Sequence, residues 1–210
     1  MTIPSTLGPP PEDLDGFPKH TASGEWHRLS GRPGRWHFSS STATSRRGGR
    51  FDLSAPLGTC YWASNFDGAL GEVTQRVPHS VVTRQRLLGL YHHRVEPHNP
   101  RAVADLVSAH ARPFGVNGEI HTTLNYAVTR SWARALQVQG WPGLRYGLRT
   151  DPSRRAHGLA LFGRAGLGVT PRGFGGAKTR KLDVAAAEKR LARWGVEVLP
   201  IPDRVPIQRL

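Results

Sequence analysis

The chain has 210 residues, of which 38% are hydrophobic, and it carries a formal net charge of +14 at pH 7. This length suits one domain with a core of its own, and the hydrophobic content excludes a disordered chain. The charge favours an anionic partner, such as a nucleotide, a nucleic acid or an acidic protein, although arginine in solvated positions from a GC-rich genome would give the same balance.

Residue counts and spacing exclude several kinds of site. The single cysteine, Cys60, rules out an intramolecular disulfide and a cysteine-cluster metal site, and its apolar run indicates a buried position. His92 and His93 are adjacent on an expected strand, so their side chains would point to opposite faces. We therefore expect no metal.

Residues 1–20 are rich in proline and lack periodicity. They predict a flexible arm, either loose or draped over a domain formed by residues 21–210. The arm contains no apolar core of a secretory signal, and no apolar run reaches the roughly 18–20 residues of a membrane span. We therefore expect a cytoplasmic protein without a membrane partner.

The first half of the domain is expected to contain strands and a loop. A short strand is expected around Trp36, and the polar, glycine-ended residues 39–49 are typical of a mobile loop. Residues 58–63, GTCYWA, indicate a buried strand between turn signals. Residues 80–95 suggest one or two further strands.

Capping residues predict where two helices begin. Asn65 or Asp67 would cap a helix that directly follows the buried strand. Asn99 followed by Pro100 is typical of an N-cap and a first helical residue, so a further helix is expected there.

The second half contains the clearest helical pattern. Residues 122–140 carry apolar side chains at helical spacing, beginning with Leu124, and Gly140 would end the helix. Asp183 would cap a last helix that ends at Gly195. Strands are expected at residues 143–149, 158–163 and 196–201. Strands and helices alternate without a regular βαβ rhythm, so we expect an α+β domain with a mixed, mostly antiparallel sheet flanked by helices.

One stretch, residues 48–72, combines groups that suit an anionic ligand. Arg50 follows two glycines, Tyr61 lies eleven residues later on the expected strand, and Glu72 lies eleven residues later again on the expected helix. Arginine binds phosphate oxygens in bidentate fashion, and tyrosine stacks on flat heterocycles. Glu72 has small and apolar neighbours that would bring it near the interior, where a lone carboxylate is unfavourable outside active sites. A simple salt bridge between Arg50 and Glu72 would explain the same pair.

The runs GGRF, GTCYWAS and ALGE in this stretch resemble the core of the RES domain family, named for an arginine, a glutamate and a serine. EWHR at Arg28, the NYAVTRSWARAL helix and GLRYGLR with GLALFG extend the resemblance over roughly residues 22–200. The resemblance implies a fold similar to the ADP-ribosyltransferase catalytic core. It also implies an NAD-degrading toxin of a bacterial toxin–antitoxin pair.

The resemblance assigns the site residue by residue. Arg50 matches the family arginine, Tyr61 the tyrosine of the central strand, and Glu72 the glutamate. The family serine tends to follow an R-Y-x pattern, where this chain has Leu148 instead. The third member of the site therefore has no direct match in this chain, and Thr150 or Ser153 would supply a nearby hydroxyl.

With NAD as the substrate, the bond to be broken joins ribose C1′ to the nicotinamide nitrogen. The leaving group departs neutral, so a single carboxylate, Glu72, suffices to stabilise the cationic sugar. Arg50, with Arg28, would neutralise the diphosphate, and Tyr61 would stack on or near the nicotinamide. The acceptor would be water or inorganic phosphate.

The resemblance also implies a partner, a cognate helix-turn-helix antitoxin, through which nucleic acid would be contacted only indirectly. Three alternatives remain open from the sequence. The same site would serve an ADP-ribosyltransferase that modifies a protein. The charge alone would suit a non-catalytic nucleic-acid-binding protein. Leu148 would suit an inactive relative with a structural or regulatory role.

Overall fold

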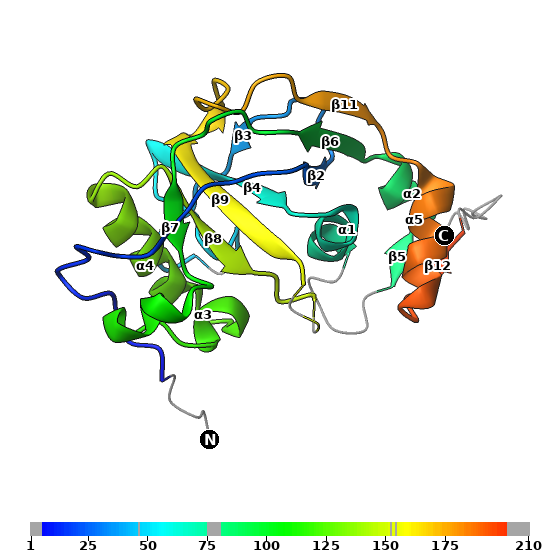
Figure 1. Ribbon diagram of the computed structural model, residues 1–210. Coiled ribbons are helices and arrows are strands. Elements are labelled where there is room, and N and C mark those ends of the chain that lie inside the picture. Colours follow the sequence, from blue (N-terminus) through cyan, green and yellow to red (C-terminus); the bar gives the residue numbers. More distant parts are fainter. Residues whose placement is uncertain (1–5, 46, 75–80, 152, 154, 201–210) are drawn as a thin grey trace, which may run out of the picture.

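The computed structural model describes residues 6–45, 47–74, 81–151, 153 and 155–200, and the structural statements below concern these residues. Eight strands form one sheet in the order β1-β7-β8-β9-β4-β2-β6-β11 (Figure 1). Every neighbouring pair in it is antiparallel except β7 and β8. The expected α+β domain with a mixed, mostly antiparallel sheet is therefore confirmed.

The strands of this sheet are β1 (Lys19–His20), β2 (Trp26–Ser30), β4 (Leu57–Ala63), β6 (Tyr91–Val95), β7 (Val103–Asp105), β8 (Gly143–Gly147), β9 (His157–Arg164) and β11 (Lys178–Lys181). Two small sheets pair β3 (His37–Phe38) with β10 (Gly166–Leu167) and β5 (Val82–Thr83) with β12 (Val198–Leu199). The helices are α1 (Phe66–Thr74), α2 (Arg84–Leu88), α3 (Glu119–Thr122), α4 (Tyr126–Val138) and α5 (Val184–Arg193), with a 3-10 helix at Ala109–Phe114. None of these helices, which cover only the described residues, is long and apolar enough to cross a membrane.

The sheet opens between β2 and β4. All seven residues of β4 pair with β9, and all five residues of β2 pair with β6. Between β2 and β4, however, the pairing is confined to His27 and Ala63. The two strands therefore diverge, and we call the opening between them the fork. Backbone groups that face the fork have no neighbouring strand to bond to, so they need side chains or water as partners.

Both faces of the central strand β4 are buried. Tyr61 and Ala63 contact the larger apolar cluster, to which α1 and α4 contribute, while Cys60 and Trp62 belong to a second cluster on the opposite face. In the second cluster Trp62 packs against Trp36 with ring centroids 4.9 Å apart. Burial on both faces explains why the strand is a continuous apolar run instead of an alternating one.

The described part of the N-terminal arm, residues 6–20, lies along α3 and α4 (Figure 1). Leu14 and Phe17 are buried in the core, and the Phe17 ring lies 4.9 Å from the ring of Phe114. The indole Nε1 of Trp132 donates to the Gly8 carbonyl over 3.0 Å. These contacts extend the apolar core beyond the sheet.

Where a capping residue precedes a strong apolar pattern, the helix begins at the position that the sequence predicted. Asn65 caps α1 by accepting from the Gly68 amide at 2.7 Å, and Asp183 caps α5 by accepting from the Ala186 amide at 3.0 Å. The long helix α4 is present, but it begins at Tyr126, so Leu124 precedes it and is 76% exposed.

The prediction of a helix that begins at Asn99 and Pro100 is wrong. Asn99 has a positive φ of 50°, and Val103–Asp105 form β7. This segment pairs with β8 and with β1, and these long-range pairings outweigh the local capping signal. Within residues 81–95, where one or two strands were expected, the structure has two strands, β5 and β6, separated by helix α2.

Candidate active site

A cavity of about 500 Å³ opens at the fork, between α1 and the loop that carries Arg50. Its wall contains all four side chains singled out from the sequence: Arg28, Arg50, Tyr61 and Glu72. Its size lies within the roughly 300–1,000 Å³ typical of small-molecule sites. The other lining residues used below are His27, Arg86, Tyr126, Tyr146, Arg149 and Thr150.

The wall of the cavity is strongly basic. Its guanidinium groups belong to Arg28, Arg50, Arg86 and Arg149, whereas Glu72 is the one lining carboxylate among the described residues. The low dielectric of a cavity strengthens the attraction of such a wall for negative charge. The arrangement therefore suits a ligand with phosphate groups, with one carboxylate set among the cations.

The backbone and side chain of Arg50 are both held in place. Its guanidinium Nη1 donates to the His121 carbonyl at the end of α3, and its own carbonyl accepts from the Thr129 hydroxyl at 2.6 Å. Within the described residues no carboxylate lies at ion-pair distance from Arg50. The salt bridge with Glu72 considered above is therefore absent, and the charge of Arg50 is not neutralised by a described carboxylate.

Arg28 occupies the fork itself. Its Nη1 donates to the Tyr61 carbonyl at 3.1 Å and to the Cys60 sulfur at 3.2 Å. The Tyr61 carbonyl belongs to the part of β4 that β2 does not reach, so Arg28 supplies the hydrogen bond that a neighbouring strand would otherwise give. Burial raises the pKa of the Cys60 thiol, which keeps it protonated beside Arg28.

The hydroxyl of Tyr61 forms its hydrogen bonds within the protein. The hydroxyl donates to Asp52 Oδ1 at 2.8 Å and accepts from the Phe51 amide at 3.0 Å. Burial, reinforced by the charge of Asp52, raises the pKa of Tyr61 well above its usual value, so the hydroxyl keeps its proton. The ring lies edge-on to Tyr146 with centroids 6.4 Å apart. The hydroxyl therefore supports the loop that carries Arg50.

Glu72 lies half-buried on α1 and has a hydroxyl beside it. Thr150 Oγ1 donates to Glu72 Oε1 at 3.3 Å. Leu148, at the position of the family serine, is only 3% exposed and packs in the core against Gly68. Ser153 instead donates to Asp151. Of the two hydroxyls considered from the sequence, Thr150 is the one that reaches the cavity.

Two buried residues that support the site were missed from the sequence. Asp52 is 2% exposed and accepts four hydrogen bonds, while Arg130 is 3% exposed and donates to four loop carbonyls. The feature that could have pointed to Arg130 is its place in the middle of helix α4. A charged side chain stands there on the same buried face as Thr129 and Ala133. For Asp52 the sequence contains no signal beyond its position two residues after Arg50.

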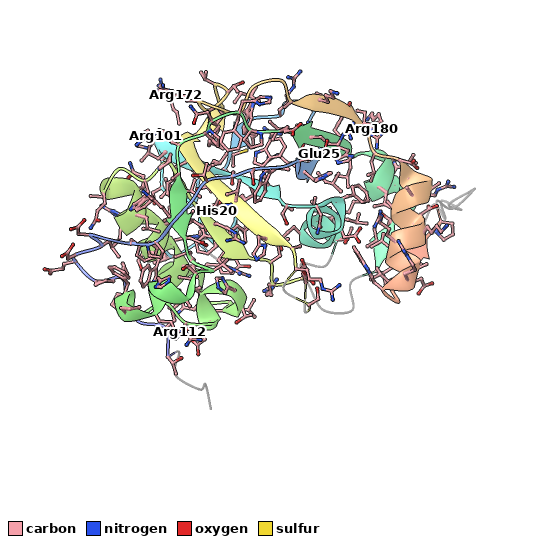
Figure 2. All side chains as sticks on the ribbon, viewed as in Figure 1. His20, Glu25, Arg101, Arg112, Arg172 and Arg180 are labelled. Atoms are coloured by element: carbon pink, nitrogen blue, oxygen red, sulfur yellow. The ribbon has the colours of Figure 1, made fainter. Side chains whose placement is uncertain are left out.

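Basic residues outside the cavity are spread over the surface. Arg101, Arg172 and Arg180 lie along one side of the molecule, and Arg112 lies at the opposite side (Figure 2). All four are exposed. Among the described residues no group of three or more His, Cys, Asp and Glu side chains could hold a metal ion.

Comparison with known proteins identifies one family. The family model of the RES domain matches residues 25–192. A chain of the crystal structure of the M. tuberculosis MbcT-MbcA toxin-antitoxin complex has a similar fold, with a TM-score of 0.55 at 16% identity, over 83% of this chain and 92% of that chain. At this identity the likeness bears on the fold alone. No curated protein matches the chain.

A pair of histidines joins β2 to β6 at the cavity: His27 of β2 lines the cavity, and His92 lies on β6. His27 Nδ1 and His92 Nε2 share a hydrogen bond of 3.0 Å, and their rings stack with centroids 5.3 Å apart. Burial is the main cause that lowers the pKa of His92 to about 4, and His27, Arg180 and Arg94 lower it further. Burial likewise lowers the pKa of His27. Both rings are therefore neutral at pH 7.

This pair predicts a loss of stability in mild acid. The unfolded state binds a proton on His92 below about pH 6.5, but the folded state binds it only near pH 4. The free energy of unfolding should therefore fall as the pH drops through this window. In urea unfolding, His92→Gln should lose less stability between pH 7 and pH 5 than the parent chain. The exposed His110→Gln should behave as the parent, and equal losses in all three proteins would contradict the assignment.

Proposed function

The chain belongs to the RES domain family, and from this premise we propose that it degrades NAD by cleaving the bond between ribose C1′ and the nicotinamide nitrogen. The observation that carries the proposal is the cavity at the fork, where a basic wall surrounds one carboxylate. The basic wall suits the diphosphate of a dinucleotide. The carboxylate suits the cationic sugar that forms when nicotinamide leaves.

Glu72 is the residue that acts on the reacting sugar in this proposal. Nicotinamide is bound to ribose through a positively charged nitrogen, and it leaves as a neutral molecule when the bond electrons move to that nitrogen. No proton donor is needed, in contrast to the two-carboxylate glycosidases. A carboxylate near C1′ or the 2′-hydroxyl stabilises positive charge that exists only in the transition state. The hydrogen bond from Thr150 would keep Glu72 oriented toward the cavity.

The arginines act on the substrate before the reaction. The diphosphate of NAD is charged in the bound substrate as well as in the transition state, so Arg50 and Arg28 contribute mainly to binding. The ring of Tyr126, which is partly exposed in the cavity wall, offers apolar surface to a base. Water or inorganic phosphate then attacks C1′, which gives ADP-ribose or its 1″-phosphate.

We further propose that the chain is the toxin of a toxin–antitoxin pair, neutralised by a cognate antitoxin of the helix-turn-helix type. Uncontrolled loss of NAD would harm the cell that makes the enzyme, so its activity must be restrained. The complex whose chain shares this fold is described as a toxin-antitoxin complex. The net charge of +14 favours rapid association with an acidic partner.

Replacement of Glu72 tests the catalytic proposal. Glu72→Gln keeps the shape of the side chain but removes its charge, and it should lower the rate of NAD loss by about 10²–10³-fold. Release of nicotinamide from NAD by the purified variant is the measurement. Glu96→Gln, the same change at an exposed position, should match the parent. Equal rates for Glu72→Gln and the parent would remove Glu72 from the mechanism.

Replacement of Arg50 tests the binding role. Arg50→Ala removes a charged partner of the diphosphate, a loss of roughly 1.5–3 kcal/mol, so KM for NAD should rise by about 10- to 100-fold while kcat changes much less. Arg172→Ala removes an exposed arginine and serves as the control (Figure 2). If Arg50 were only structural, the variant would lose thermal stability and keep the KM of the parent.

Expression in bacteria tests the toxin proposal and its outcome in the cell. The chain alone should deplete cellular NAD and arrest growth, and co-expression of the protein encoded by the neighbouring gene should restore both.

With NAD labelled in the ADP-ribose part, label on free ADP-ribose or its phosphate supports degradation, whereas label on protein supports the ADP-ribosyltransferase alternative. An abundant, folded chain that leaves NAD unchanged would show that the toxin proposal is wrong.

A further inference from the structure

We propose that Asp52 is a positioning residue that holds Arg50 in the cavity, and that Tyr61 serves the same task through its hydroxyl. The proposal rests on the proposed function in one respect, the binding of NAD by Arg50. It assigns Tyr61 a role different from stacking on nicotinamide, because the contacts of its hydroxyl lie inside the protein.

The Asp52 carboxylate organises four donors. Its Oδ1 accepts from the Ser39 hydroxyl at 3.0 Å and from the Tyr61 hydroxyl at 2.8 Å. Its Oδ2 accepts from the Ser41 hydroxyl at 2.7 Å and from the Gly49 amide at 2.8 Å. These donors come from the segment after β3, from β4 and from the loop before Arg50, so one carboxylate ties three segments together.

No cation within the described residues forms an ion pair with Asp52. A buried carboxylate is costly unless hydrogen bonds compensate for lost water, and here neutral donors alone provide that compensation. Because Arg50 forms no ion pair with Asp52, the charge of Arg50 stays available to a ligand. The arrangement thus fixes the loop without neutralising Arg50.

The two glycines before Arg50 allow the loop to approach Asp52. At Gly48, whose φ is +99°, a Cβ atom would lie 2.6 Å from Asp52 Oδ2. At Gly49 it would lie 2.4 Å from the Tyr61 hydroxyl oxygen. Side chains at these positions would push the loop away from its anchors, which explains the GGR sequence in terms of this network.

Helix α4 holds the same loop from the other side. Arg130 donates to the carbonyls of Thr42, Ser45 and Arg47 at 2.7–2.8 Å and to that of Gly49 at 3.2 Å. Together with the bond from Thr129 to the Arg50 carbonyl, these contacts fix the loop backbone before Arg50 and at Arg50 itself. The position of the guanidinium is therefore set before any ligand binds, and a preorganised cation binds more tightly than a mobile one.

Hydrogen exchange tests the positioning role without NAD. Asp52→Asn places an amide group among donors, so bonds from the Gly49 amide and the Tyr61 hydroxyl are weakened. Exchange of the Gly49 and Phe51 amides should become faster than in the parent. Asp13→Asn, the same change at an exposed aspartate, should leave their exchange unchanged. Unchanged exchange at both amides in Asp52→Asn would overturn the proposal, whether or not the chain degrades NAD.

Steady-state kinetics separate positioning from general stability. Asp52→Asn should raise KM for NAD by roughly 10- to 100-fold with little change in kcat, as expected when a binding group is displaced. Combined with Arg50→Ala, the second substitution should add almost nothing, because both remove the same interaction. Effects that add fully in the double variant would assign Asp52 a purely structural role.

Tyr61→Phe provides the second variant. It keeps the ring and removes the hydroxyl, so it leaves any stacking on NAD intact and releases the Phe51 amide. We expect faster exchange of the Phe51 amide and a raised KM, as in Asp52→Asn. A Tyr61→Phe protein with the exchange and KM of the parent would overturn the proposed role of the hydroxyl, including where Asp52→Asn fails to fold.

Discussion

The fork between β2 and β4 is the constraint on which the rest of the site depends. A sheet that paired these strands along their full length would close the cavity and leave no place for Arg28. Instead, pairing is confined to His27 and Ala63, and Arg28 bonds to the unpaired carbonyl of Tyr61. The guanidinium thus stabilises the open sheet and contributes positive charge to the cavity wall.

Around the fork, structural and ligand-binding tasks fall to different residues. Asp52 and Arg130 are buried and hydrogen-bonded to neutral backbone and hydroxyl groups, and neither forms an ion pair within the described residues. They fix the loop that presents Arg50. Arg50 and Glu72, in contrast, lie in the cavity wall on separate elements without pairing to each other. A binding site of this kind is organised by its supporting contacts before the ligand arrives.

The sequence predicted those features that depend on neighbours along the chain. The β4 strand, the Asn65 cap and the start of α1 follow from local patterns, and this local arrangement brings Tyr61 and Glu72 to one cavity. Long-range contacts decided the rest. β7 forms because β8 lies beside it, against the capping signal of Asn99. The role of Asp52 requires the Tyr61 hydroxyl and a loop held by Arg130 from 83 residues away. After β8, Leu148 is buried in the core, whereas the Thr150 hydroxyl lines the cavity and donates to Glu72.

The central claim is that the cavity at the fork binds NAD with its scissile bond at Glu72. A crystal structure of the Glu72→Gln protein with NAD tests it most directly, because the variant should bind the substrate and turn it over slowly. The account predicts the diphosphate beside the guanidinium groups of Arg50 and Arg28, with the nicotinamide ribose next to residue 72. NAD bound on another surface, or a cavity without NAD at saturating concentration, would contradict the account.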